Sequence, residues 1–223
     1  MGKLAVVVVG GGPLSPHAEQ AWQELVDATA EVEVIAADSG LDHAIAAGIE
    51  PDRLVGDLDS VSAAGRMWAY AHGVDIDEHP TDKDATDTEL ALAAAVSDPQ
   101  LTDLLLLGGL DPLVDDRLDH VLGNLLVLGH PALATFQSVR AIVGASEVVV
   151  LHPGGRADLG LDAGQTFSLL ALHGPCRGVS VTGARWPLSG AELTGYEARG
   201  LSNVSDGSTI VGVAEGVLTV VIP

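Results

Sequence analysis

Short apolar runs alternate with Ala- and Leu-rich amphipathic stretches along the first 144 residues. The apolar runs predict buried strands at residues 4–9, 32–37, 53–55, 74–76 and 104–107. The amphipathic stretches predict helices at residues 16–30, 41–47, 67–72, 87–96 and 120–128. Strands that alternate with helices are typical of βαβ units, so we expect a mainly parallel, Rossmann-like α/β domain.

The pattern changes after Ser146. Segments rich in β-forming residues follow one another closely at 147–151, 166–172, 178–182 and 217–222, with Gly and Pro between them and no helical periodicity. Short strands separated by turn residues are typical of a small β-sandwich. The chain is therefore expected to be an α/β protein of two domains, residues 1–144 and residues 145–223.

The composition is strongly acidic. The 223 residues include 31 Asp and Glu against 10 Lys and Arg, a formal net charge of −21. Residues 1–144 hold 24 of the acidic and 6 of the basic residues, and residues 145–223 hold the other 7 and 4. Such a chain lacks the basic surface that binds nucleic-acid phosphates, and an anionic membrane would repel it. Neither partner is expected.

Cysteine content and hydropathy indicate the compartment. Cys176 is the only cysteine, so no disulfide can form within the chain, and we interpret it as a packing residue rather than a nucleophile. No segment has the roughly 20 consecutive apolar residues of a membrane span. These features favour a cytoplasmic protein.

Aspartates follow the predicted strands of the first domain. Asp38 follows residues 32–37, and Asp57 and Asp59 follow residues 53–55. Two more segments continue the series, 81–87 (Thr-Asp-Lys-Asp-Ala-Thr-Asp) and 117–120 (Arg-Leu-Asp-His). Because ligands of open α/β sheets bind outside the carboxyl ends of the strands, these segments are expected to converge. Clustered carboxylates without a Cys/His set favour Mg²⁺, bridged to the phosphates of a nucleotide.

Each segment also has a purely structural interpretation. Asp-Ser-Gly and Gly-Asp-Leu-Asp-Ser are good turn sequences, and Thr86 with Glu89 fits a helix capping box. His120 and Asn124 are four residues apart and could share a packed helix face. The run Gly10-Gly11-Gly12 lacks the spacing of a dinucleotide fingerprint, so we interpret it as a strand-to-helix turn that could approach a phosphate.

Taken in order, these motifs resemble the thiamine pyrophosphokinase (thiamine diphosphokinase) family. The resemblance rests on the segments Asp38-Ser39-Gly40, Gly48-Ile49-Glu50-Pro51-Asp52, Gly56-Asp57-Leu58-Asp59-Ser60, Thr81-Asp82-Lys83-Asp84-Ala85-Thr86-Asp87 and Arg117-Leu118-Asp119-His120. It continues in Gly183-Ala184-Arg185-Trp186-Pro187-Leu188 and Gly200-Leu201-Ser202-Asn203. It implies transfer of a pyrophosphoryl group from Mg–ATP to the hydroxyl of thiamine, giving thiamine diphosphate and AMP. It also implies a homodimer with sites between subunits.

The resemblance assigns roles to particular residues. Asp57, Asp59 and Asp84 would surround the metal and the triphosphate. The wider ATP and metal set would be Asp38, Asp57, Asp59, Asp82, Asp84, Asp87, His120 and Asn124. Lys83, Arg117 and Asp119 complete the catalytic set, in which Lys83 and Arg117 would add fixed positive charge where phosphoryl transfer gains negative charge. Either Asp84 or Asp59 could accept the proton of the thiamine hydroxyl.

Thiamine would be held by Trp186, Ser202 and Asn203. An indole face attracts a cationic ring, which suits the thiazolium of thiamine, although Trp186 could instead be a core residue of the sandwich. Two departures from the family pattern stand out. Asp115 and Asp116 precede Arg117, where the family has glycines, and Ser39 replaces a glycine.

Three other functions are compatible with these residues. The chain could be a pyrophosphokinase for another alcohol such as a pterin, or a metal-dependent phosphohydrolase in which water is the nucleophile. It could also be a nucleotide- or thiamine-binding protein whose altered loop has weakened catalysis.

Overall fold

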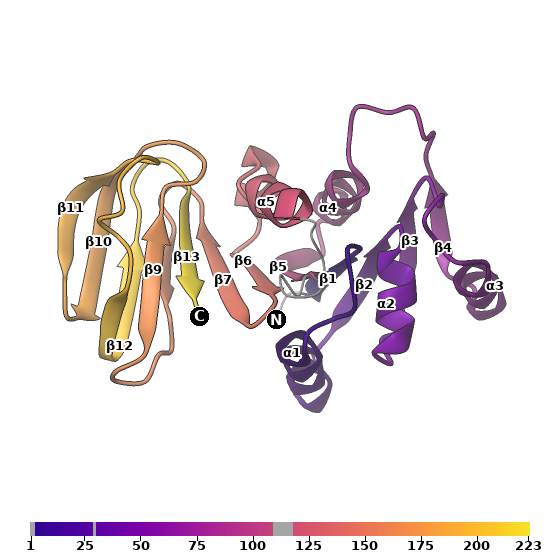
Figure 1. Cartoon of the computed structure of the whole chain (residues 1–223), viewed down its shortest axis with the longest axis horizontal. Helices are drawn as coiled ribbons and strands as arrows, with labels where there is room; N and C mark the ends of the chain where they lie inside the picture. Colours follow the sequence, from indigo (N-terminus) through magenta and orange to yellow (C-terminus); the bar gives the residue numbers. More distant parts are fainter. Residues whose placement is uncertain (1–2, 29, 109–117) are drawn as a thin grey trace. The chain divides into compact units, whose positions relative to one another are not determined.

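The computed structural model describes residues 3–28, 30–108 and 118–223. The chain divides into two compact units (Figure 1). Unit 1 comprises residues 1–127 and 135–145, and unit 2 comprises residues 128–134 and 146–223. Among the described residues, none of the helices is both long and apolar enough to cross a membrane.

Unit 1 is built on a parallel sheet with the strand order β6-β5-β1-β2-β3-β4. Its strands are β1 (Lys3–Val9), β2 (Val32–Ala37), β3 (Arg53–Gly56), β4 (Asp75–Glu78), β5 (Leu101–Gly108) and β6 (Ser138–Val143). The central strands β1 and β5 are nearly continuous apolar runs, because helices cover both faces of a parallel sheet. The edge strand β4 reads Asp-Ile-Asp-Glu, and its charges discourage pairing with another chain. The expected parallel α/β arrangement is confirmed.

Within the described residues, five helices connect these strands: α1 (Pro16–Asp27), α2 (Gly40–Ala46), α3 (Ala63–His72), α4 (Asp87–Ser97) and α5 (Leu118–Val127). In Figure 1, α1 and α2 lie on one face of the sheet, and α4 and α5 lie on the other. The side chains of Ser15, Ser62 and Thr86 cap α1, α3 and α4 at their N-termini. The predicted capping box of Thr86 and Glu89 is present, with both reciprocal hydrogen bonds formed.

Two glycines allow the chain to approach itself closely where β1 and β2 end. A Cβ atom on Gly40 would lie 2.1 Å from the carbonyl oxygen of Val8, so only glycine lets α2 begin against β1. A Cβ atom on Gly10 would lie 2.3 Å from Oγ of Ser39. The side chain of Ser39 therefore fits here because Gly10 has no side chain.

Unit 2 contains antiparallel strands and, among its described residues, no α-helix. Its strands are β7 (Ser146–Leu151), β8 (Arg156–Asp158), β9 (Thr166–Leu170), β10 (Cys176–Ala184), β11 (Leu188–Leu193), β12 (Asn203–Gly212) and β13 (Leu218–Ile222), and a 3-10 helix, η1 (Pro131–Thr135), begins in it. Phe167, Val179, Val181 and Leu218 form the centre of its core. Cys176 is fully buried in this core, as expected of a packing residue.

Candidate active site

The loops at the carboxyl ends of β1, β2 and β3 surround a cavity of about 440 Å³ in unit 1. The N-terminal turn of α4 and one face of α5 complete its walls. The cavity is lined by Gly10, Gly11, Ala37, Asp38, Ser39, Asp57, Asp59, Ser60, Thr86, Asp87, Thr88, Asp119, His120, Gly123, Asn124 and Val127. The cavity therefore lies where the sequence predicts a ligand site, outside the carboxyl ends of the parallel strands.

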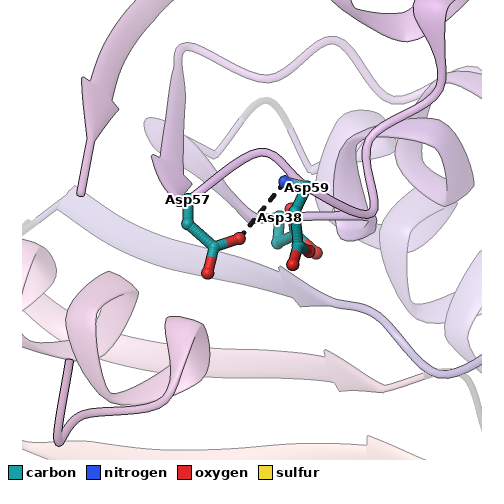
Figure 2. Close-up of side chains that lie close together, drawn as sticks. All are labelled: Asp38, Asp57 and Asp59. Atoms are coloured by element: carbon teal, nitrogen blue, oxygen red, sulfur yellow. Dashed lines mark hydrogen bonds between the residues drawn. The ribbon is translucent and has the colours of Figure 1, made fainter. Parts of the chain in front are cut away.

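Three aspartates converge in this cavity. Asp38, Asp57 and Asp59 each offer a carboxylate oxygen, and these oxygens lie within 4.8 Å of one another (Figure 2). The backbone N–H of Asp59 donates a hydrogen bond to Oδ1 of Asp57 at 3.2 Å, and the hydroxyl of Ser60 donates to Oδ1 of Asp59 at 2.9 Å. The turn after β3 thus orients two carboxylates toward a third from the turn after β2.

The backbone of these turns adopts an unusual conformation. Asp38 has a φ of 47° and Leu58 a φ of 62°, both in the left-handed region, which Asp adopts more readily than most residues and Leu rarely adopts. The backbone N–H of Asp38 donates to the carbonyl of Val55 at 2.9 Å, which ties the two turns together. Leu58 is buried in a cluster with Leu41 and Leu54. Burial of this leucine side chain holds the turn in the form that presents Asp57 and Asp59.

Lys83 joins two carboxylates of the site. Its Nζ atom lies 2.6 Å from Oδ2 of Asp57 and 3.1 Å from Oδ1 of Asp87. The hydrogen bond with Lys83 is the largest cause that lowers the pKa of Asp57, and the same bond is the largest cause that raises the pKa of Lys83. Both groups are therefore held in their charged forms.

The pKa of Asp38 is shifted in the opposite direction from that of Asp57. Asp38 is buried, and Oδ1 has no hydrogen-bond partner among the described residues. Burial is the largest cause that raises its pKa, and the charges of Asp87, Asp57 and Asp59 add to the effect, against a backbone hydrogen bond from Ser39. A buried acceptor beside two further carboxylates fits a divalent cation with oxygen ligands, such as Mg²⁺.

Helices α4 and α5 supply the remaining predicted residues of this cavity. Asp87 lies in the first turn of α4, and Asp119, His120 and Asn124 lie on α5. Oγ1 of Thr88 donates to Oδ1 of Asn124 at 3.2 Å, which links the two helices. The shared face of His120 and Asn124 therefore lines the cavity and is not simply a packing face.

Some predicted residues lie elsewhere. Asp82 and Asp84 are exposed on the loop before α4 and do not line the cavity. Arg117 and the altered segment before it lie outside the described residues. The hydroxyl residues Ser60 and Thr88 line the cavity but were not predicted. The sequence could have indicated both, because each directly follows an aspartate that was predicted to belong to the site.

A second cavity, of about 550 Å³, lies within unit 2. It is lined by Leu169, Arg185, Trp186, Pro187, Leu188, Arg199, Gly200, Leu201, Ser202 and Asn203. The three residues expected to hold thiamine therefore share one cavity, and the side chain of Trp186 is 55% exposed rather than part of the core.

The side chain of Asn203 forms hydrogen bonds with the backbone of Trp186. Oδ1 of Asn203 accepts hydrogen bonds from the N–H of Trp186 at 3.1 Å and of Val204 at 2.9 Å. Nδ2 donates to the carbonyl of Trp186 at 2.8 Å. Ser202 has a φ of 57°, and its N–H donates to Oγ of Ser168 at 3.1 Å. The buried amide thus positions the indole, whereas Ser202 is held in a strained turn at the cavity.

Comparisons with known proteins agree for both units. The family model described as "Thiamin pyrophosphokinase, catalytic domain" matches residues 26–142, and "Thiamin pyrophosphokinase, vitamin B1 binding domain" matches residues 156–218. The thiamine pyrophosphokinase of Bacillus subtilis (strain 168) is 26% identical over 161 residues, 72% of each chain. The crystal structure of the B. subtilis enzyme matches with a TM-score of 0.76 at 24% identity, covering 99% of this chain and 98% of that one. That of the Geobacillus thermodenitrificans enzyme matches with a TM-score of 0.73 at 26% identity, covering 98% and 96%.

Proposed function

Because this chain belongs to the thiamin pyrophosphokinase family, we propose that it transfers the pyrophosphoryl group of ATP to the hydroxyl of thiamine, giving thiamine diphosphate and AMP. The observation that carries the assignment is the convergence of Asp38, Asp57 and Asp59 in a cavity at the carboxyl ends of the strands. A Mg²⁺ ion on these three carboxylates would offset the negative charge of the triphosphate.

The residues of the chain have distinct parts in this proposal. Asp38, Asp57 and Asp59 would together hold the Mg²⁺ of Mg–ATP, and the buried oxygen of Asp38 is free to coordinate it. Lys83, held between Asp57 and Asp87, supplies a fixed positive charge beside the phosphates. Of the two candidate proton acceptors, Asp59 lines the cavity and Asp84 does not, so we assign the proton of the thiamine hydroxyl to Asp59. Asp84 and Asp82 are proposed to act only at longer range.

The cavity of unit 2 is proposed to bind thiamine. Trp186 offers an exposed aromatic face to the thiazolium, and Asn203 holds that face in place. In this interpretation unit 1 is a Rossmann-like nucleotide-binding domain and unit 2 is a small thiamine-binding β-sandwich. The parallel strand order of unit 1 and the antiparallel pairs around one apolar core in unit 2 support it.

The decisive experiment measures products. Purified protein with ATP, Mg²⁺ and thiamine is expected to release AMP and thiamine diphosphate in equal amounts, and a hydroxymethylpterin should not replace thiamine. ADP or free phosphate as the main product would favour a kinase or a hydrolase, and binding without turnover would favour the binding-protein alternative. Asp59→Asn should abolish turnover, whereas Asp75→Asn, an exposed aspartate on the edge strand, should not.

We also propose that the enzyme is a cytoplasmic homodimer. Leu118, Leu122 and Leu126 form an exposed row on α5, four positions apart along the helix, and such a row is typical of a surface that another chain covers. We name the cavity of unit 2 the Trp186 cavity and the cavity of unit 1 the Asp57 cavity. In a homodimer, the Trp186 cavity of one copy and the Asp57 cavity of the other would together form one site.

Mixing two impaired variants tests this arrangement, at a thiamine concentration too low for Trp186→Ala to bind it. Asp59→Asn and Trp186→Ala damage different cavities. If each site takes one cavity from each copy, then half of the randomly mixed dimers should regain one intact site, for about a quarter of the wild-type activity. If both cavities of a site come from the same copy, no activity should return.

A further inference from the structure

The Trp186 cavity is positively charged in a protein that is otherwise acidic. Residues 145–223 contain four basic residues, and two of them, Arg185 and Arg199, line this cavity. No carboxylate lines it among the described residues. A cavity for a cationic vitamin alone would gain from carboxylates, so the pair of arginines requires another explanation.

Neither arginine is neutralised by the protein. Arg177, on the same unit, lies 3.5 Å from a carboxylate oxygen of Glu192 and 3.7 Å from one of Glu215. Arg185 and Arg199 form no such ion pair with any carboxylate in the described part of the chain. Unpaired guanidinium groups on a concave surface are suited to an oxyanion, which they can bind through two parallel hydrogen bonds.

Arg185 lies over the ring of Trp186. Its Cζ atom lies 5.4 Å from the centre of the Trp186 ring, within the range of a cation–π contact. A thiazolium ring on the same indole would lie beside the guanidinium, and the two cations would repel each other. A ligand that carries phosphate beside its thiazolium would instead attract Arg185.

We infer that Arg185 and Arg199 make the Trp186 cavity selective for the phosphorylated product, so that thiamine diphosphate binds there more tightly than thiamine and slows its own formation. This inference rests on the proposed function. Thiamine carries a positive charge, whereas its diphosphate is net negative at neutral pH. The arginines therefore distinguish the two by charge, and the indole provides the contact that they share.

Calorimetry is carried out on metal-free protein in EDTA, so that no Mg²⁺ can bridge the aspartates of unit 1 to the phosphates and raise the affinity for the diphosphate. We expect the wild type to bind thiamine diphosphate about tenfold more tightly than thiamine. Arg185→Gln should remove this preference and leave thiamine affinity equal or slightly higher, and Arg199→Gln should reduce the preference. Raising the salt concentration should weaken binding of the diphosphate but not of thiamine.

Arg156→Gln is the matched control, since Arg156 is exposed, lies in the same unit and does not line the cavity. Its affinities should equal those of the wild type. Equal affinity of the wild type for thiamine and its diphosphate would overturn the inference, and so would an equal loss in Arg156→Gln and Arg185→Gln. A loss of AMP binding in Arg185→Gln would assign the cavity to the nucleotide instead.

Product inhibition separates this inference from the proposed function. In the complete reaction, the inhibition constant of thiamine diphosphate should rise about tenfold in Arg185→Gln. If the wild type makes no thiamine diphosphate, the proposed function fails. If it does so, and Arg185→Gln remains equally sensitive to product, then only the inference fails.

Discussion

The Nζ atom of Lys83 lies 2.6 Å from Oδ2 of Asp57 and joins the loop before α4 to the turn after β3. The same ammonium lies 3.1 Å from Oδ1 of Asp87. A single cation thus holds two carboxylates of the candidate site, each from a different element. Its positive charge offsets part of the repulsion between these carboxylates.

Lys83→Gln is expected to lower kcat by about 100-fold, because a fixed positive charge beside the phosphates is lost. The chain offers a matched control, since Lys3 is its only other lysine. Lys3 pairs with Glu33 at 2.6 Å, at the amino end of β1 and away from the cavity. Lys3→Gln should retain wild-type kinetics, and an equal loss in both variants would contradict a specific part for Lys83.

Asp57 and Asp38 should affect stability in opposite directions as the pH changes. The pKa of Asp57 is lowered, so its stabilising contribution is present above its unfolded pKa and is lost as the pH falls through the folded value. The pKa of Asp38 is raised, so stability is lost as the pH rises through its folded value. In metal-free buffer at pH 7, Asp57→Asn should therefore melt below the wild type and Asp38→Asn above it.

The gain for Asp38→Asn should be about 1 kcal/mol, or roughly 2–4 °C in Tm, since a buried carboxylate without a partner is removed. Both differences should shrink in thermal scans toward pH 3. Melting shifts of the same sign for the two variants at pH 7 would contradict the assigned environments.

Mg²⁺ should stabilise the protein without any substrate. A ligand that binds only the folded state adds about 2.7 kcal/mol at a concentration 100 times its Kd. Thermal scans at rising Mg²⁺ should show increasing Tm for the wild type and for Asp75→Asn, an exposed aspartate outside the cavity. Asp38→Asn should show little increase. A full response in that variant would exclude Asp38 as a ligand.

Asn203 should act on thiamine binding through Trp186. Asn203→Ala leaves the N–H and the carbonyl of Trp186 without their partners, which should cost about 1–3 kcal/mol in urea unfolding and weaken thiamine binding about tenfold. Trp186→Ala should weaken thiamine binding with little change in stability, because its side chain is half exposed. If Asn203→Ala lowered stability but left thiamine binding intact, the positioning role would be wrong.

Gly40→Ala should destabilise the protein by about 1–3 kcal/mol, because the new methyl group would meet the carbonyl oxygen of Val8. Gly123→Ala is the matched variant, since Gly123 also lies in a helix but no atom lies within 4 Å of the added Cβ. It should stabilise by roughly 0.5–1 kcal/mol through helix propensity. Chemical denaturation of both variants compares the signs, and destabilisation by both would contradict the proposed contact.

The elements that the sequence predicts well are those in which local chemistry and burial agree. The Val-rich run of β1 and the capping box of Thr86 and Glu89 each indicate one structure only. β6, β8, β11 and β12 were not predicted. β12 reads as polar, but the hydroxyls of Ser205 and Thr209 are buried and bonded, with Oγ1 of Thr209 donating to the carbonyl of Gly183 at 2.6 Å. Only the neighbouring chain segments provide those partners.

The motifs in the sequence indicated the family, and the sequence by itself determined the alternation of strands and helices in the first half and the turns that carry Asp38, Asp57 and Asp59. Spacing along the chain and residue type are sufficient for these, because they depend on neighbours within a few positions. The tertiary structure decided which acids meet, that Lys83 lies between two of them, and that Asn203 holds Trp186. Lys83 and Asp57 are 26 positions apart in the sequence, and Asn203 and Trp186 are 17 positions apart. The packing of strands and turns brings each pair into contact.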